Sequence, residues 1–237
     1  PYLSFSPISG TLSDCGEDGT ETITVTYAPA EVQDDDYTIT VWDGKTASLK
    51  KTITVHCTAS APEQTMTWNQ TFGTKLTTDL ITFDATTDAV RTEENPYPVV
   101  YTTSDASVAT IINGNQLNIL KSGTVTVTAS QDGIDGKGRQ RYNAVSLDKT
   151  ITIDKATPTV TFPTTTPITY GTALAQSQLV GGSAKVNYQG VETPLNGSFN
   201  WTDVGQFKPA GTQSYQVVWT PENTVLYNSV SGNVSIT

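Results

Sequence analysis

The chain has 237 residues, of which 15% are charged, and its formal net charge is −10 at pH 7. The acidic excess lies in residues 1–60 and 61–154, because residues 155–237 carry three basic and three acidic side chains. An acidic chain without a basic stripe repels phosphate backbones and anionic lipids, so we expect no nucleic-acid partner. No apolar run approaches the roughly 18 residues that span a bilayer, so we also expect no membrane insertion in this segment.

The composition favours β-structure along the whole chain. Thr and Ser alternate with Val and Ile, and apolar residues nowhere keep a helical spacing for long, so we expect almost no helix. Within residues 1–60, Gly- and Asp-rich turns separate four predicted strands whose Thr residues share one face, as in half of a β-sandwich. These strands are predicted at residues 2–5, 22–27, 37–42 and 49–57.

A second module is predicted at residues 61–154, after a short polar linker at residues 58–64. Asn113-Gly114 is a hairpin signal between two apolar runs, and Ser122-Gly123 breaks the chain before another alternating run. Seven strands at this spacing are typical of an immunoglobulin-type sandwich. They are predicted at residues 66–69, 80–85, 99–103, 108–112, 116–120, 124–129 and 146–153.

A third module is predicted at residues 155–237, and an internal repeat relates it to the second. The sequence YNAVS at residues 142–146 recurs as YNSVS at residues 227–231, and a final strand follows each copy. The loop before the first copy, residues 131–141, is six residues longer than its counterpart, so we expect it to be mobile, to tolerate deletion and to carry partner contacts. Only residues 154–158 join the two modules, and Pro158 stiffens this linker, so we expect an end-to-end arrangement with distant termini.

Short sequence patterns give the three modules a family resemblance. In the first, LSFSPISGTL, TITVTYAP and DYTITV resemble the C-terminal part of Ig-like modules of the Hydin and BACON kind, whose earlier strands are missing here. In the second, TWNQTF, ITFDAT and VVYTTSDASVATI resemble the bacterial Ig-like (Big) repeats of large cell-surface and adhesin-like proteins. In the third, ITYGTALAQSQLVGG and AGTQSYQVVWTPEN resemble the related MBG-type repeats.

These resemblances imply an all-β fold of tandem immunoglobulin-like β-sandwich modules in an elongated array. They imply a non-catalytic stalk or adhesive segment of a large bacterial protein, located outside the cell on its surface. The implied partners are neighbouring Ig-like modules of the same protein. A module that binds glycan or a host surface protein stays open as an alternative, as does an accessory region of an extracellular carbohydrate-active enzyme.

The titratable residues do not favour catalysis. His56 is the only histidine, and it adjoins Cys57 on a predicted strand, where neighbouring side chains point to opposite faces and cannot activate each other. The sequence has no phosphate-binding Gly loop, no zinc-ligand spacing and no marked carboxylate pair, so we expect no enzyme activity and no cofactor. Cys15 and Cys57 are predicted to form a disulfide in an oxidising compartment, although two unreactive thiols fit the same spacing.

Two acidic clusters offer oxygen ligands for Ca²⁺, although a solvated acidic turn needs the same residues. The first cluster contains Glu31, Asp34, Asp35 and Asp36, and the second contains Asp132 and Asp135.

Aromatic and basic residues define the possible ligand contacts. Trp42 lies on the Thr face of its strand, where it is either exposed or covers the junction with the second module. Together with Asp135, Lys137 and Arg139 it forms the candidate contact set. The other tryptophans share strand faces with apolar residues, so we expect them in the core, and we expect two tyrosines to bond their hydroxyls to nearby backbone as in a tyrosine corner. These residues are Trp68, Trp201 and Trp219, and Tyr142 and Tyr227.

Overall fold

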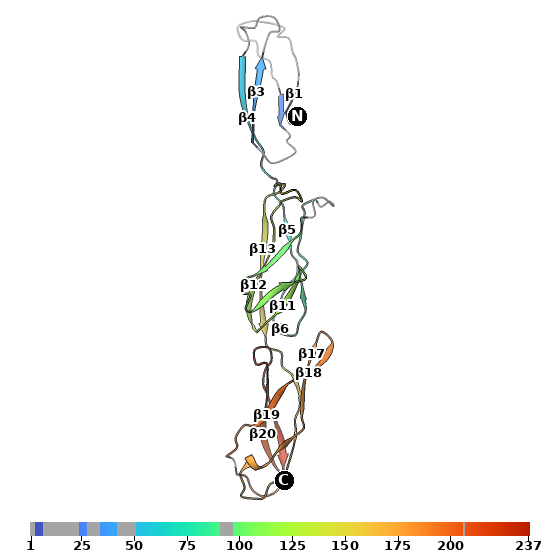
Figure 1. Cartoon of the computed structure of the whole chain (residues 1–237), viewed down its shortest axis with the longest axis vertical. Helices are drawn as coiled ribbons and strands as arrows, with labels where there is room; N and C mark the ends of the chain where they lie inside the picture. Colours follow the sequence, from blue (N-terminus) through green and yellow to red (C-terminus); the bar gives the residue numbers. More distant parts are fainter. Residues whose placement is uncertain (1–2, 7–23, 28–33, 42–50, 91–96, 206) are drawn as a thin grey trace. The chain divides into compact units, whose positions relative to one another are not determined.

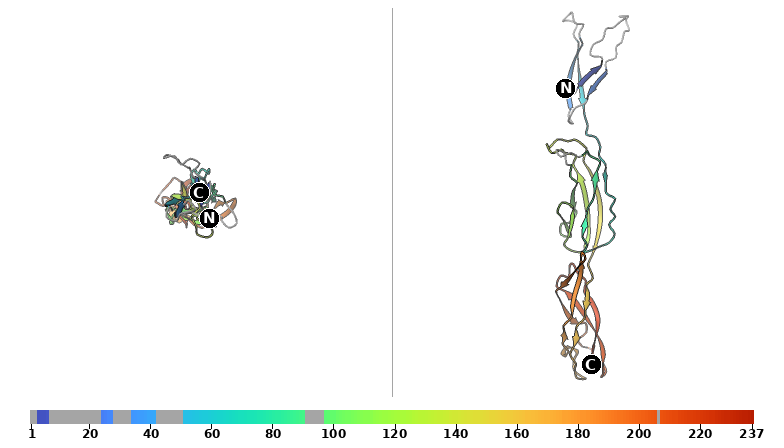
Figure 2. Two further views of the ribbon diagram at one scale, coloured as in Figure 1. Left: turned by 90° about the horizontal axis from the view of Figure 1, so that it is seen from above. Right: turned by 90° about the vertical axis from the view of Figure 1, so that its right-hand side faces the viewer.

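The computed structural model describes residues 3–6, 24–27, 34–41, 51–90, 97–205 and 207–237. Figures 1 and 2 show that these residues form β-strands joined by loops, and their one helical element is the 3₁₀ turn η2 (Leu174–Gln176). The prediction of an all-β fold is therefore confirmed. None of the described residues belongs to a helix with the length and apolar character that a membrane crossing requires.

The chain folds into two compact units that do not coincide with the predicted modules. Every strand pairing among the described residues nevertheless joins two residues of the same predicted module. The module boundaries stay a prediction, and below "module two" and "module three" denote residues 61–154 and 155–237. The first unit comprises Pro1–Met66, Thr87–Pro98 and Gln131–Val145, and the second comprises Thr67–Thr86, Val99–Ser130 and Ser146–Thr237.

Module two contains a three-stranded sheet in the order β10-β11-β7 and a four-stranded sheet in the order β6-β13-β12-β9, besides the short pair β5-β8. The hairpin between β10 and β11 turns at Asn113 (φ 51°) and Gly114 (φ 79°), the two positive φ values that an Asn-Gly hairpin turn needs. The bounds are β5 Met66–Thr67, β6 Lys75–Leu76, β7 Ile81–Thr82, β8 Thr86–Thr87, β9 Val100–Thr103, β10 Ala109–Ile112, β11 Gln116–Ile119, β12 Gly123–Gln131 and β13 Val145–Asp154.

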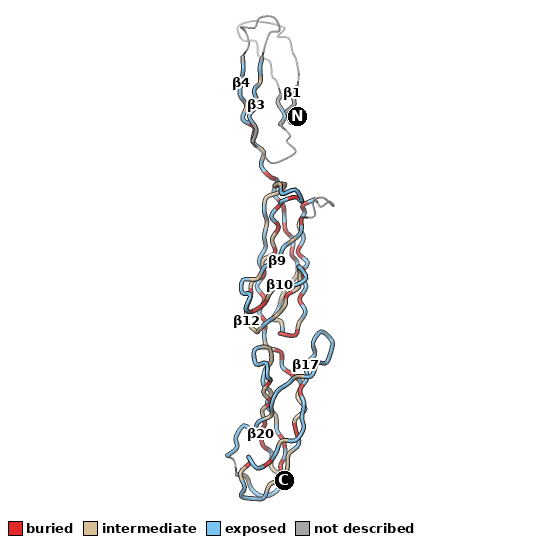
Figure 3. The backbone as a smooth tube through the Cα atoms, in the orientation of Figure 1, coloured by how far each residue is buried: buried red, intermediate tan, exposed pale blue. Residues whose placement is uncertain are grey.

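The core of module two follows from the alternation of its strands. Along β12, buried Val125 and Val127 alternate with threonines outside the core. Figure 3 shows short buried stretches between intermediate and exposed ones along the backbone of this module. Trp68 is 4% exposed and packs edge-on against Phe83 at 5.5 Å and Tyr101 at 5.8 Å between ring centroids. The predicted core position of Trp68 is therefore confirmed.

Module three has three small sheets, in the orders β14-β17-β18, β15-β16 and β19-β20-β21. Tyr215, Val217 and Trp219 are buried on one face of β20, as predicted, and Trp201 is half-buried against the ring of Tyr215. Leu174 in η2 completes this part of the core. The bounds are β14 Thr159–Thr161, β15 Thr164–Thr165, β16 Leu179–Val180, β17 Ser183–Tyr188, β18 Val191–Leu195, β19 Gly197–Trp201, β20 Gln213–Pro221 and β21 Val230–Ile236.

Residues 1–60 supply two antiparallel strand pairs to the first unit, β1-β2 and β3-β4. The four strands predicted here are present, with shifted ends. In β4 the side chain of His56 is exposed and Cys57 is buried, so the two side chains do point to opposite faces. The bounds are β1 Leu3–Ser6, β2 Thr24–Tyr27, β3 Asp34–Val41 and β4 Lys51–Thr58.

Candidate functional site

The hairpin between β12 and β13 contains a network of polar contacts in the first unit. An antiparallel bridge joins Ile134 to Gln140, and the backbone N–H of Asp135 donates to the carbonyl oxygen of Arg139 at 2.9 Å. Gly133 has φ 76°, and a Cβ atom there would lie 2.0 Å from the carbonyl oxygen of Tyr142, so only glycine allows this close approach. The insertion is therefore an internally bonded hairpin, and its mobility stays a prediction.

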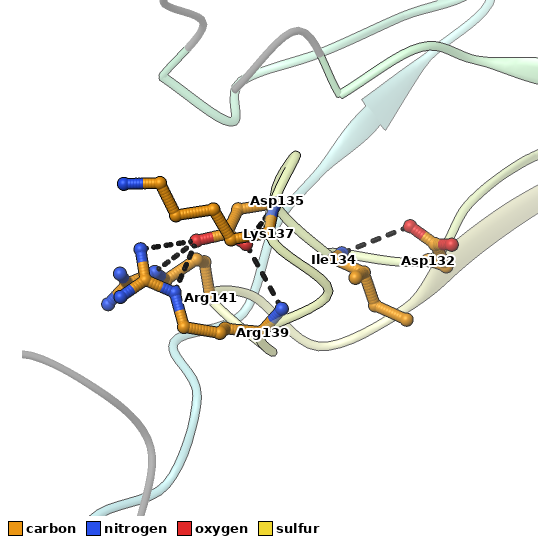
Figure 4. A network of polar contacts seen from close by, with 6 residues as sticks. All are labelled: Asp132, Ile134, Asp135, Lys137, Arg139 and Arg141. Atoms are coloured by element: carbon orange, nitrogen blue, oxygen red, sulfur yellow. Dashed lines mark hydrogen bonds and ion pairs between the residues drawn. The ribbon is translucent and has the colours of Figure 1, made fainter. Parts of the chain in front are cut away.

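The carboxylate of Asp135 lies at the centre of this hairpin (Figure 4). Its Oδ1 accepts the backbone N–H groups of Lys137 at 2.8 Å and Arg139 at 3.0 Å. Its Oδ2 accepts Arg139 Nε at 3.0 Å, Arg139 Nη2 at 2.9 Å and Arg141 Nε at 3.0 Å. The side chain of Asp135 has 0% exposed surface, whereas the two arginine side chains are partly exposed. One buried anion thus organises the whole turn.

Electrostatics keep this carboxylate ionised. Burial alone would raise the pKa of Asp135, but the hydrogen bonds from the backbone of Arg139, the side chain of Arg141 and the backbone of Lys137 outweigh burial. Together with the Arg139 guanidinium they hold the pKa of Asp135 well below its ordinary value. A carboxylate that is enclosed and already paired with two guanidinium groups stabilises its own loop and has no surface for a ligand.

This geometry corrects the expectation that Asp135 is a surface contact or a free Ca²⁺ ligand. Arg139 is committed to Asp135, and Lys137 is exposed and gives its backbone N–H to the same carboxylate. Asp132 is exposed, and its Oδ1 accepts the backbone N–H of Ile134 at 3.0 Å instead of converging with Asp135. Figure 4 shows the two carboxylates on separate parts of the turn.

The other acidic cluster is also arranged differently from the prediction. Asp34, Asp35 and Asp36 belong to β3 and pair with β4, so they do not form the acidic turn that we expected. The exposed carboxylate of Asp36 bonds His56 Nδ1 at 2.7 Å. In the described ranges, no three His, Cys, Asp or Glu side chains come close enough to hold a metal ion.

Three predicted residues, Cys15, Glu31 and Trp42, lie outside the described residues. Cys57 is 8% exposed. Because Cys15 is not among the described residues, the Cys15–Cys57 disulfide stays a prediction.

The Tyr-Asn repeat forms a contact that the sequence did not reveal. In the first unit, the backbone N–H of Asn143 donates to the carbonyl oxygen of Pro62 at 2.9 Å. Its side-chain Nδ2 donates to the carbonyl oxygen of Ala61 at 3.1 Å and to Glu63 Oε1 at 2.8 Å. One asparagine therefore holds three successive residues of the segment that enters module two.

The second copy of the repeat makes the same contact inside the second unit. The backbone N–H of Asn228 donates to the carbonyl oxygen of Ala156 at 2.9 Å. Its Nδ2 donates to the carbonyl oxygen of Lys155 at 3.2 Å and to Thr157 Oγ1 at 2.9 Å. We call each set of three hydrogen bonds a linker clamp. The spacing of the repeat identified the position, but only the fold brings the asparagine to a linker some 70 to 80 residues earlier.

The neighbouring tyrosine has a different role from the one predicted. The hydroxyl of Tyr142 accepts the backbone N–H of Val90 at 3.2 Å, and its ring packs edge-on against Tyr97. Because Val90 is distant in sequence, this bond is not the local tie of a tyrosine corner. The asparagine makes the linker clamp in both copies of the repeat, and the predicted role of the Tyr227 hydroxyl stays a prediction.

Comparisons with known proteins identify no family for this chain. No family model matches it, and no curated protein matches it. Among solved structures, mouse protocadherin-24 EC1-3 aligns over 99% of this chain and 89% of its own, with 12% identity and a TM-score of 0.26. An endo-fucoidan hydrolase from glycoside hydrolase family 107 aligns over 99% of this chain and 38% of its own, with 13% identity and a TM-score of 0.27.

Proposed function

We propose that this chain is a non-catalytic spacer segment of a bacterial cell-surface protein, built from tandem Ig-like modules of the Big and MBG type. The observation that carries the proposal is the linker clamp, which the chain uses twice with the same donor atoms. Asn143 clamps residues 61–63, and Asn228 clamps residues 155–157. A spacer needs a reproducible connection between modules more than it needs an exposed reactive group.

The linker between modules two and three supports this proposal in detail. Ala156 is 2% exposed, and its backbone N–H donates to the carbonyl oxygen of Leu226 at 3.1 Å. Lys155 Nζ donates to the carbonyl oxygen of Thr224 at 2.6 Å. Pro158 fixes its own φ and biases Thr157 towards an extended conformation. Because Lys155 and Ala156 are hydrogen-bonded to the loop before Tyr227 and Pro158 restricts the backbone, this short linker loses most of its conformational freedom.

The energetic scale of the clamp fits a positioning role. A net contribution of about 0.5–1.5 kcal/mol per hydrogen bond gives roughly 1.5–4.5 kcal/mol for the three bonds of each clamp. That is enough to bias a short linker towards one conformation by a factor of ten or more. It is also small compared with the burial of a module core, so a module can keep its fold when its clamp is broken.

Small-angle scattering on the monomeric chain tests this proposal. A compact globule of this length has a radius of gyration of about 18 Å. The spacer proposal requires a clearly larger value for the natural chain, and a broader distance distribution for the double variant Asn143→Ala/Asn228→Ala because both linkers gain freedom. Asn233→Ala is the matched control, since Asn233 is exposed on β21. A natural radius near 18 Å would contradict the spacer function.

A further inference from the structure

Module three carries a groove of about 600 Å³ at the end that contains Thr237. Buried Tyr215 and Ile236 lie in its lining, together with half-buried Ile168. Two aromatic side chains in the lining, Tyr170 and Phe207, are 75% and 69% exposed. All of these residues belong to the second unit. Exposed rings beside a buried apolar floor are unusual on the surface of a single module.

The corresponding end of module two is covered by the entry loop of module three, so the two ends can be compared. In module two the last strand, β13, ends at Asp154, whose carbonyl oxygen accepts the backbone N–H of Thr77 at 2.9 Å. In module three the equivalent bond runs from the backbone N–H of Ile168 to the carbonyl oxygen of Thr237 at 3.3 Å. Thr77 and Ile168 therefore occupy corresponding positions.

A second pair of positions supports the correspondence. Ser122 directly precedes β12, and Gln213 begins β20, the equivalent strand of module three. Gln213 lines the groove. The groove thus contains the counterparts of Thr77, Ser122 and Asp154, which form the end of module two.

These counterparts in module two hold the entry loop of module three. Thr77 Oγ1 donates to the carbonyl oxygen of Leu226 at 2.6 Å and accepts the backbone N–H of Ala156 at 3.0 Å. The backbone N–H of Ser122 points to the carbonyl oxygen of Val225 at 3.4 Å. As a result Thr77 is only 6% exposed. All of these contacts lie within the second unit.

We propose that the groove on module three is the docking face for another β-sandwich module joined in tandem. That module would place its entry loop, of the kind formed by residues 223–228, over Ile168 and Gln213. The occupant's chemistry follows from the existing junction, where the loop offers the backbone carbonyls of Val225 and Leu226. The groove lining includes one charged side chain, Lys208, whose Nζ lies 4.5 Å from the centroid of the Tyr215 ring, and a loop that offers backbone carbonyls suits this cation.

The two docking faces differ in the interaction that they favour. The position of Thr77, which uses a hydroxyl, is occupied in module three by apolar Ile168, and the groove adds the exposed rings of Tyr170 and Phe207. Docking on module three would therefore bury apolar surface where the existing junction relies on a hydroxyl. This inference rests on the proposed spacer function, because it extends the same junction to a second position.

The test extends the full chain with a second copy of residues 155–237 placed directly after Thr237. The appended copy carries Tyr170→Phe and Phe207→Tyr, so that mass spectrometry distinguishes its peptides from those of the inner copy. Hydrogen exchange is measured over residues 168–172 and 207–213 in both copies. We expect exchange in the inner copy to be at least about tenfold slower than in the outer copy, whose groove is uncovered.

A second extended chain provides the control. It carries Val225→Asp and Leu226→Asp in the appended copy, which places two charges in the docking loop beside an apolar floor, and exchange in the two grooves should then become equal. Equal exchange in the first extended chain overturns the inference. That result is independent of the scattering test, because the junction at residues 154–158 can be well ordered whether or not the groove on module three accepts a module.

Discussion

The loops before the two Tyr-Asn repeats occupy the same place in their modules and are stabilised in different ways. In module three, Asn223 Oδ1 accepts the backbone N–H groups of Val225 and Leu226, both at 3.2 Å, and a short turn suffices. In module two, Asp135 accepts two backbone N–H groups in a comparable way, and it also binds two arginines within a longer hairpin. The linker clamp that follows is the same in both modules, whereas the preceding loop differs in length and sequence. In each loop a side chain accepts the backbone N–H groups of the turn.

The largest expected effect comes from Asp135→Asn. Asparagine still accepts one backbone N–H, but its amide group turns a donor towards two guanidinium groups that are left without an anion. We expect the melting temperature to fall by about 5–10 °C, measured by differential scanning calorimetry. Asp132→Asn, on the exposed side of the same hairpin, should change this temperature by less than about 2 °C. A similar small change for Asp135→Asn would show that the buried network does not stabilise the hairpin.

The pH dependence of the Asp135 contribution follows from the direction of its pKa. The folded-state pKa is lowered, so the contribution is fully present above the unfolded-state value of about 3.9 and is lost as the pH falls through the folded-state pKa. The stability difference between the natural chain and Asp135→Asn should be constant from about pH 5 to 7 and should shrink below about pH 4. Urea titrations of both proteins across this range measure it, and a difference that persists unchanged to about pH 2 would contradict the assignment.

Gly133 and Gly138 both have a positive φ, but only at Gly133 would a Cβ atom clash with a neighbour. Alanine at the two positions therefore distinguishes a steric clash from the backbone penalty alone. Gly133→Ala would place Cβ against the carbonyl of Tyr142, so we expect a loss of about 2–3 kcal/mol in free energy of unfolding. Gly138 has nearly the same φ, 78°, but a Cβ atom at this position would have no neighbouring atom within 4 Å. Gly138→Ala should therefore cost only the left-handed backbone penalty of about 1 kcal/mol. Equal losses in the two variants would mean that the clash with Tyr142 is relieved by movement.

Alternation of polar and apolar residues predicted most of this fold, because the two faces of a strand are chemically distinct. Trp68 and Trp219 were placed in the core for that reason, and the Asn113-Gly114 turn was predicted from its φ requirement. The very short strands β6 and β8 were missed because two residues show no periodicity. The acidic residues of β3 were assigned to a turn, since composition alone favoured a solvated cluster over a paired strand.

The candidate site was less predictable, because its contacts join residues that are distant in sequence. The repeat drew attention to Tyr142 and Tyr227, whereas the clamps depend on Asn143 and Asn228. Asp135 was interpreted as exposed because it lies among glycines and charges. The two arginines that enclose it follow within six residues, but their convergence depends on left-handed glycines and the Ile134–Gln140 bridge, which only the folded hairpin shows.

The smallest expected effect comes from Asn223→Ala, the counterpart in module three of the Asp135 substitution. It removes one exposed side-chain acceptor from two backbone N–H groups that water can reach, so we expect a loss of about 0.5–1 kcal/mol in free energy of unfolding. Asn223→Asp retains the acceptor and should restore most of that loss. We also expect Asn223→Ala to leave the Asn228 clamp intact, as in the comparison of the two loops. Slow hydrogen exchange of the Asn228 backbone N–H would show this. Loss of that protection would show that the loop and the clamp form one cooperative element in module three, and the clamp could then no longer be regarded as independent of the loop before it.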